Sequence, residues 1–142
     1  MTEFTHRIEL TGDIKQIFPL FTPRGEEAWV PGWAPTYLNG KDTREEMLFT
    51  TGEGAETTFW TCLKWQPETH HARYLRITPA SRIAIVDVVC RAQSPKQVAV
   101  QVTYTYTPLT PTAAAELATM TQRQYADSID EWAALITQHL ST

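Results

Sequence analysis

Apolar residues in the C-terminal part of the chain recur with the period of an α-helix. They stand three to five positions apart, at Leu117, Met120, Tyr125, Ile129, Trp132, Ile136 and Leu140. Thr110 is suited to cap the start of such a helix, and Pro111 fits its first position, where a missing N–H costs nothing. The pattern predicts one amphipathic helix from residue 111 to about residue 139.

The rest of the chain shows mainly the two-residue alternation of β-strands. The expected strands cover residues 4–10, 45–51, 57–65, 72–78, 82–91 and 97–107. Short joints that contain Gly or Pro connect most of the later strands, which favours antiparallel hairpins. Asp13 and Thr22 are capping residues that predict two short helices after the first strand. The order predicts an α+β fold, in which one long helix packs on an antiparallel sheet of about six or seven strands.

Alternation also predicts which side chains of the sheet face the helix, and it leaves two registers open. The inner set of the last strand is Val98, Val100, Val102, Tyr104 and Tyr106. An even-numbered loop at Ser94-Pro95 adds a second inner set from the two preceding strands, namely Ile83, Ile85, Asp87 and Val89 with Ala72, Tyr74 and Arg76. A one-residue bulge would instead turn another set inward, namely Leu75, Ile77, Val86 and Val88. The first register is the one we expect.

The least regular stretch, residues 30–40, contains two prolines and two glycines, which exclude a long helix or a central strand. Three large aromatic residues nevertheless lie in or beside it, at Trp29, Trp33 and Tyr37. A merely solvated loop would not carry such groups. Two interpretations remain open, because these rings could form the rim or lid of a pocket or could plug one end of the core.

Composition narrows the class of protein. A chain of 142 residues is long enough to bury a core, and we expect a single domain over residues 1–142. The net charge is −4 and no Lys/Arg cluster occurs, so no nucleic-acid partner is expected. No apolar run approaches the roughly 20 residues that cross a bilayer, and the N-terminus lacks a signal pattern. We therefore expect no membrane insertion and a cytoplasmic location. Cys62 and Cys90 fit small buried residues better than a disulfide or metal pair.

Several segments resemble a known superfamily. They are residues 17–23 (IFPLFTP), 29–35 (WVPGWAP) and 73–79 (RYLRITP), together with the final helix that contains Tyr125, Glu131 and Trp132. In these features the chain is similar to the SRPBCC superfamily, the START-like group of birch-pollen-allergen-like proteins, lipid-transfer domains and polyketide cyclases, and most of all to its small bacterial members. The resemblance implies a helix-grip fold, in which a curved antiparallel sheet wraps around the C-terminal helix and encloses an apolar cavity. It transfers no catalytic residues, because members of the superfamily differ in activity.

Residues expected to bind a ligand come from the irregular loop, the inner face of the sheet and the helix. The set is Trp29, Trp33, Tyr37, Phe49, Tyr74, Arg76, Ile85, Asp87, Val102, Tyr104, Met120, Tyr125, Ile129 and Trp132. Within this set, Tyr74 and Arg76 could orient a ligand in an apolar pocket, since a guanidinium is suited to a carboxylate. The alternative is that Arg76 lies on the solvent face.

Candidates for acid–base catalysis are Asp87, Arg76 and His6. Asp87 would serve as a general base inside a cavity, whereas elsewhere it would face solvent or pair with Arg76. His6 lies on the inner face of the first strand and could transfer a proton, but a lone strand histidine is more often structural. His70 and His71 fall in an expected hairpin turn, where they would be exposed. No set of residues has metal-ligand spacing or forms a phosphate loop, so neither a metal nor a cofactor is expected.

These features favour a protein that binds a small hydrophobic ligand, such as a lipid, polyketide or aromatic compound, as a monomer or homodimer. One alternative is a cyclase or dehydratase for a polyketide-like or aromatic substrate. It requires the polar candidates Asp87, Arg76, Tyr74, Tyr104 or His6 to converge. A further alternative is a protein-interaction domain of the chaperone-regulator type, which a filled core and an exposed apolar patch would favour.

Overall fold

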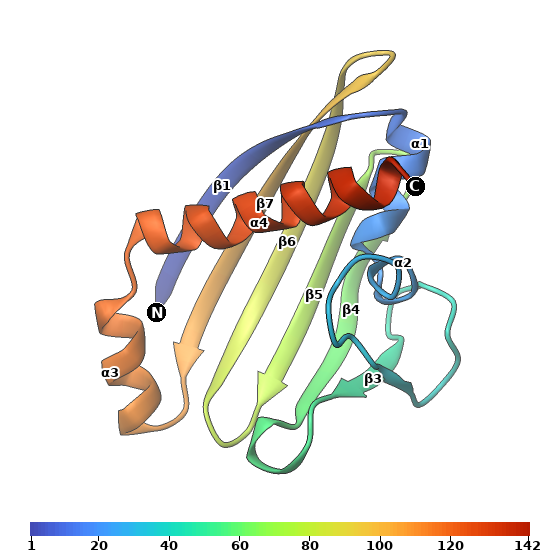
Figure 1. The fold of residues 1–142 in the computed structure, drawn as a ribbon. Helices are drawn as coiled ribbons and strands as arrows, with labels where there is room; N and C mark the ends of the chain where they lie inside the picture. The colour runs from blue at the N-terminus through green and yellow to red at the C-terminus, as the bar shows by residue number, and fades with distance from the viewer.

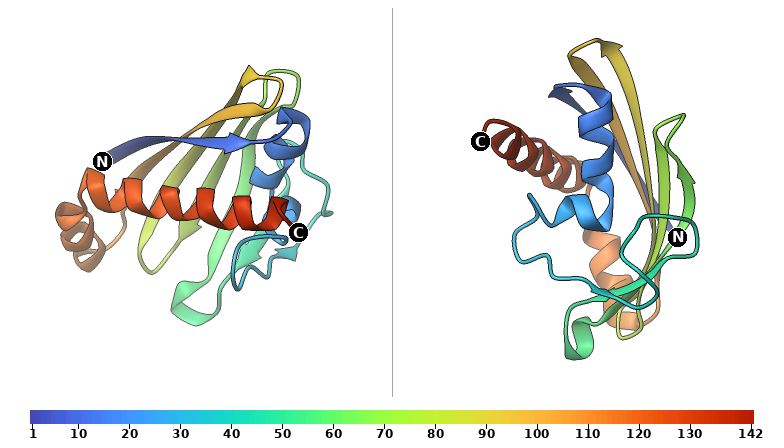
Figure 2. Two further views of the ribbon diagram at one scale, coloured as in Figure 1. Left: turned by 45° about the horizontal axis from the view of Figure 1, so that its top comes forward. Right: turned by 90° about the vertical axis from the view of Figure 1, so that its right-hand side faces the viewer.

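The computed structural model describes residues 1–142 as a curved antiparallel sheet with a helix across its concave face (Figures 1 and 2). The strands are β1 (Thr2–Thr11), β2 (Thr36–Tyr37), β3 (Leu48–Thr51), β4 (Thr58–Gln66), β5 (His71–Thr78), β6 (Arg82–Ser94) and β7 (Gln97–Pro108). Strands β2 to β7 pair in chain order, and β1 adds to the free edge of β7. The α+β helix-grip fold that the sequence predicts is confirmed.

Short helices follow β1 and lie beside the far end of the sheet from the N-terminus (Figure 1). They are α1 (Ile14–Ile17), the 3₁₀ helix η1 (Phe18–Phe21) and α2 (Pro23–Glu26), and a further 3₁₀ turn, η2, spans Gly54–Glu56. The predicted caps are both in place: the Asp13 carboxylate accepts from the Lys15 N–H at 2.8 Å, and the Thr22 hydroxyl accepts from the Gly25 N–H at 2.9 Å.

The predicted single C-terminal helix is wrong, because the structure contains two helices, α3 (Pro111–Thr119) and α4 (Gln122–Leu140). Met120 between them has an extended backbone. Thr121 begins a new helix with a capping box, in which its hydroxyl accepts from the Gln124 N–H at 3.1 Å and the Gln124 side chain accepts from the Thr121 N–H at 3.0 Å. The spacing of apolar residues continues unchanged through this break, so it does not indicate where the first helix ends.

The expected register of the sheet is wrong for β6 and correct for β5. A β-bulge between Ala92 and Ser94 turns Val86 and Val88 toward the helix, opposite Tyr104 and Val102 of β7. Thr78 pairs with Arg82, so the loop between β5 and β6 contains three residues, 79–81. This odd loop length reverses the expected inward face a second time, for β5. Tyr74 and Arg76 therefore face inward as expected, whereas Ile85 and Asp87 lie on the outer, convex face.

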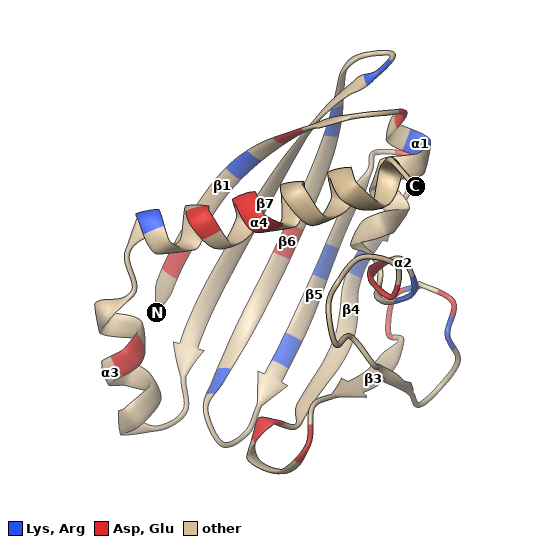
Figure 3. Ribbon diagram, in the orientation of Figure 1, with Lys and Arg blue, Asp and Glu red and all other residues tan.

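The core lies between the concave face of the sheet and α4, with the short helices closing one end. Cys62 and Cys90 are buried free thiols, as predicted, and burial raises their pKa values to about 11 and about 12. Lys and Arg residues are scattered over several elements rather than gathered in a stripe (Figure 3). None of the helices combines the length and the hydropathy that crossing a membrane requires.

Candidate functional site

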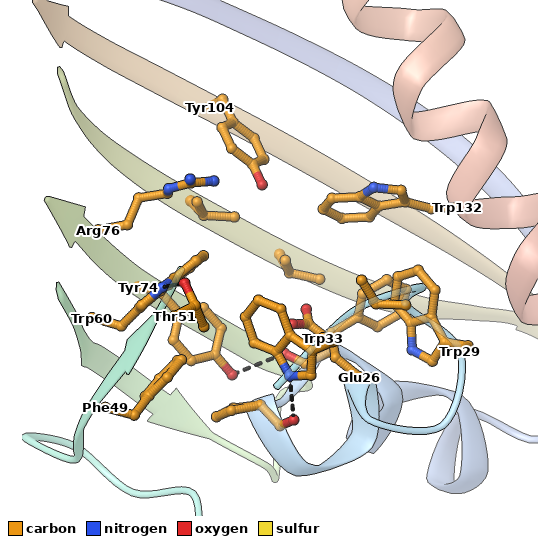
Figure 4. Close-up of a pocket in the computed structure, with 15 residues that line it drawn as sticks. Glu26, Trp29, Trp33, Phe49, Thr51, Trp60, Tyr74, Arg76, Tyr104 and Trp132 are labelled. Carbon is orange, nitrogen blue, oxygen red and sulfur yellow. Dashed lines mark hydrogen bonds between the residues drawn. The ribbon is translucent and has the colours of Figure 1, made fainter. Parts of the chain in front are cut away.

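A cavity of about 290 Å³ lies at the end of the concave face, where the sheet, the short helices and α4 meet. Its wall combines strands β3 to β7 with η1, α2, the loop after α2, and α4 (Figure 4). The lining residues are Phe21, Pro23, Glu26, Trp29, Val30, Trp33, Phe49, Thr51, Trp60, Tyr74, Arg76, Val86, Val88, Tyr104 and Trp132.

Aromatic rings form most of this wall, and they pack against one another mainly edge to face. The ring centroids of Trp33 and Trp60 are 5.6 Å apart, and those of Trp29 and Trp132 are 5.8 Å apart. Protein groups already satisfy several of their polar atoms. The indole N–H groups of Trp29 and Trp33 each donate to a backbone carbonyl at 2.8 Å, and that of Trp60 donates to a threonine hydroxyl at 2.9 Å. The rings are thereby held in place and present apolar faces to the cavity.

Glu26 is the one carboxylate in the cavity wall, and α2 places it there. Gly25 makes this possible, because a Cβ at this position would lie 2.0 Å from the Pro19 carbonyl oxygen. The Glu26 side chain makes no hydrogen bond or ion pair with the protein, and it faces the cavity (Figure 4). Burial raises its pKa from 4.5 to about 8, although the positive charge of Arg76 acts in the opposite direction.

Arg76 and Tyr104 enter the cavity from β5 and β7 (Figure 4). The Arg76 guanidinium lies over the Trp60 ring, with its Cζ 4.8 Å from the ring centroid, and makes no ion pair. Burial raises the pKa of the Tyr104 hydroxyl, and the nearby Arg76 charge opposes this shift. Tyr104 therefore remains a protonated hydrogen-bond donor at neutral pH.

The structure brings half of the predicted ligand-binding residues together around this cavity. These seven are Trp29, Trp33, Phe49, Tyr74, Arg76, Tyr104 and Trp132. The loop aromatics Trp29 and Trp33 line the wall, as the rim interpretation required, while Trp29 is also buried in the core. The hydroxyl of Tyr74 is not free, because it donates to the Phe21 carbonyl at 2.9 Å.

Ile85 and Asp87 lie outside the cavity, on the convex face, because of the register described above. Asp87 does not pair with Arg76. Its carboxylate instead lies 2.7 Å from Nε2 of His71 on the neighbouring strand. His71 belongs to β5 and is half-buried, so the expectation of an exposed turn residue is wrong for His71. His70 does lie in the turn, as expected, but it is half-buried rather than exposed.

Five other predicted binding residues also lie away from the cavity. Val102 and Ile129 are core residues, and Tyr125 donates from its hydroxyl to the Val102 carbonyl at 2.7 Å. Met120 and Tyr125 border a separate, more polar hollow near the start of α4. Tyr37 lies beside Phe49 on the neighbouring edge strand β2 and donates a hydrogen bond to Glu27.

His6 faces inward on β1, as expected, but it is not part of the cavity wall. Its Nε2 lies 2.7 Å from an Asp130 oxygen on α4, so it joins the edge strand to the helix. Of the three acid–base candidates, only Arg76 lines the cavity.

Sequence reasoning missed eight lining residues: Phe21, Pro23, Glu26, Val30, Thr51, Trp60, Val86 and Val88. Trp60 carried a usable signal, since it alternates with Cys62 on the predicted strand and is a large aromatic residue. Glu26 carried none, because a glutamate in a short helix normally faces solvent. No three His, Cys, Asp or Glu residues lie close enough together to hold a metal ion.

No protein-family model matches the sequence, and no similar sequence was found among curated proteins. Solved structures match it in fold. Norcoclaurine synthase from Thalictrum flavum aligns with a TM-score of 0.65 at 10% identity, over 94% of this chain and 86% of that chain. The same enzyme has been solved in complex with dopamine and hydroxybenzaldehyde. The di-domain ARO/CYC protein BexL from the BE-7585A biosynthetic pathway gives 0.69 at 13% identity, over 99% of this chain and 47% of that chain.

A hypothetical protein from Helicobacter pylori gives a TM-score of 0.73 at 7% identity, over 97% of this chain and 87% of that chain. At such low identities these similarities show the fold alone. The chain therefore shares its overall fold with these proteins, and this is the helix-grip arrangement that the sequence predicts.

Proposed function

We propose that this protein binds a small, flat aromatic molecule in the cavity between α2, α4 and the concave face of the sheet. The observation that carries the proposal is the cavity itself, about 290 Å³ in volume and walled mainly by fixed aromatic rings. Sites for small molecules are typically concave and apolar, with a few polar groups that orient the ligand.

The volume of the cavity sets the size of the ligand. A cavity of about 150 Å³ accommodates benzene, so twice that volume suits a molecule of roughly two fused rings. The wall also favours planar molecules, because aromatic rings gain from offset and edge-to-face contacts. Two structural neighbours lend support. The structure of norcoclaurine synthase has been solved with the single-ring aromatic ligands dopamine and hydroxybenzaldehyde, and BexL is described as an ARO/CYC protein, an aromatase/cyclase.

Filling the cavity tests the proposal. Val86→Phe places a larger side chain in the cavity wall, so we expect isothermal titration calorimetry to show at least about tenfold weaker binding of 2-naphthoate. Ile85→Phe is the matched control, because the neighbouring residue on β6 faces the convex surface. Equal affinities of the two variants, or no binding to the unmodified protein, would contradict the proposal.

An enzyme of the cyclase or dehydratase type is a second candidate, favoured by the free polar groups of Glu26, Arg76 and Tyr104 in one cavity. A carboxylate whose pKa is about 8 has the right strength for proton transfer near neutral pH. Glu26, rather than Asp87, would then be the general base of the reaction. Mass spectrometry of polyketide-like and aromatic test compounds after incubation separates the candidates, since a binding protein returns each of them unchanged.

An interaction domain is the third candidate, and the convex face supports it through the exposed apolar side chains Leu48, Phe59 and Leu63. The open cavity argues against it, because that function calls for a filled core. We further propose a single domain that acts in the cytoplasm as a monomer or homodimer. A larger assembly in light scattering would contradict the last point.

A further inference from the structure

The Arg76 guanidinium is a cation without an ion-pair partner in a wall formed mainly by apolar and aromatic side chains. None of the chain's ion pairs includes Arg76, and Glu26, the one carboxylate in the cavity wall, is not within ion-pair distance of it. Arg76 is half-buried, so its charge is partly shielded from water, and a charge-assisted hydrogen bond to an anion is stronger there than at an open surface. The Arg76 guanidinium is therefore available to pair with an anionic group of a ligand.

The surroundings of Arg76 orient its donors for a planar anion. Its guanidinium is held over the face of Trp60, which leaves the N–H edge free, and the Tyr104 hydroxyl stands beside it as a further donor (Figure 4). Two parallel N–H donors from a guanidinium match the two oxygens of a carboxylate. An ammonium group, by contrast, would meet a like charge at this end of the cavity.

Glu26 does not cancel the positive charge at neutral pH. The titratable groups close enough to influence it are Arg76 from β5 and the hydroxyls of Tyr37, Tyr74 and Tyr104. Arg24 of α2 pairs at 3.8 Å with Glu27, the residue that follows this helix. Its pKa of about 8 means that most molecules carry a neutral carboxyl group at pH 7. The cavity then has a net positive charge from Arg76.

We infer that the ligand is an aromatic carboxylate, whose anionic group binds Arg76 and the Tyr104 hydroxyl while its ring lies among the tryptophans. The inference rests on the proposed function and names the ligand class for the same site. The neutral Glu26 carboxyl is left to form a hydrogen bond with a polar substituent elsewhere on the ring. The cavity size limits the ring system to roughly two fused rings.

The experiment compares 2-naphthoate with its neutral analogue 2-naphthamide by isothermal titration calorimetry at pH 7. We expect the unmodified protein to bind the carboxylate at least about tenfold more tightly than the amide. Arg76→Met should reduce this ratio to near one. Arg73→Met is the control, because Arg73 stands three residues earlier on β5 and faces the convex surface; it should keep the ratio unchanged.

The outcomes separate the inference from the proposed function. Equal binding of both compounds to the unmodified protein overturns the inference and leaves the aromatic binding site standing. A preference for the carboxylate that survives Arg76→Met also overturns it. No binding of either compound overturns the proposed function and the inference with it. Circular dichroism of each variant confirms that it is folded before the ratio is measured.

A second variant tests the same inference without touching Arg76. In the unmodified protein, ionisation of Glu26 above pH 8 introduces a negative charge opposite the ligand, so the preference for 2-naphthoate should fall several-fold between pH 7 and pH 9. Glu26→Gln has no such ionisation, and its ratio should stay constant over this range. A ratio that falls equally in both proteins contradicts the assigned charge pattern.

Discussion

At the scale of single residues, the site depends on which alternate side chains of β5 and β6 face the cavity, and on one glutamate, Glu26. The sequence predicts an apolar inner face for β6, but alternation alone does not choose between Ile85 and Val86, because both are β-branched and apolar. The bulge at Ala92–Ser94 makes this choice for β6, and a three-residue loop then sets the inward face of β5. Neither feature has a distinctive sequence. Arg76 was placed correctly only because these two deviations cancel.

Glu26 shows a different limit of sequence reasoning. Its inward position results from the close approach of Gly25 to Pro19, which is a contact in space rather than a local pattern. Its chemistry follows from the same position, since burial without a partner favours the protonated form. Only the assembled structure brings Glu26, Arg76 and Tyr104 to one cavity.

The raised pKa of Glu26 predicts how stability depends on pH. Between about pH 4.5 and pH 8 the folded protein holds a proton that the unfolded chain has released, so the free energy of unfolding should fall as pH rises through this range. Glu26→Gln removes this slope. We expect the variant to be more stable than the unmodified protein at pH 9 by about 1 to 3 kcal/mol, less than the full pKa difference implies because the cavity admits water.

Urea denaturation at pH 5, 7 and 9 measures this effect. Glu131→Gln serves as the control, since Glu131 is exposed on α4 and should leave the pH dependence of unfolding unchanged. A parallel pH dependence of Glu26→Gln and the unmodified protein would show that Glu26 ionises in the folded state much as it does in the unfolded chain.

At the scale of elements, the strands and short helices follow from local pattern, whereas the division of the C-terminal helix does not. Hydrophobic spacing is the same on both sides of Met120, and Thr121 is an ordinary helix residue as well as a good cap. The second helix starts where the chain must change direction to cross the sheet, which is a requirement of the tertiary structure (Figure 1). The short strand β2 was missed for a related reason, because it forms only by pairing with β3.

The capping box at Thr121 provides a test of two helices against one. If α4 begins at Gln122, Thr121→Ala removes a cap and should lower the free energy of unfolding by about 1 kcal/mol, and Thr121→Ser should restore most of it. In a continuous helix the alanine would be neutral or stabilising, because alanine is the better helix former. Urea denaturation of the variants distinguishes the two cases. Thr119→Ala, in the last turn of α3, is the control and should change the free energy of unfolding little.

At the scale of the whole molecule, the fold creates two faces with different properties. The concave face and α4 enclose the aromatic cavity, while the convex face of the same strands carries exposed apolar residues and the His71–Asp87 pair. The order of elements in the sequence is enough to predict this architecture. The cavity is not predictable in the same way, because a few side chains at the end of the sheet decide whether the space is filled.

The five tryptophans provide the most direct test that this cavity holds an aromatic ligand. Trp29, Trp33, Trp60 and Trp132 line it, whereas Trp65 stacks on Phe18 outside it, with 5.1 Å between their ring centroids. The measurement is a titration of ¹⁵N-labelled protein with 2-naphthoate, followed through the indole N–H signals. Saturable shifts of the four cavity signals with an unmoved Trp65 signal are the predicted result. No saturable shift, or shifts centred on Trp65, would contradict binding in the cavity.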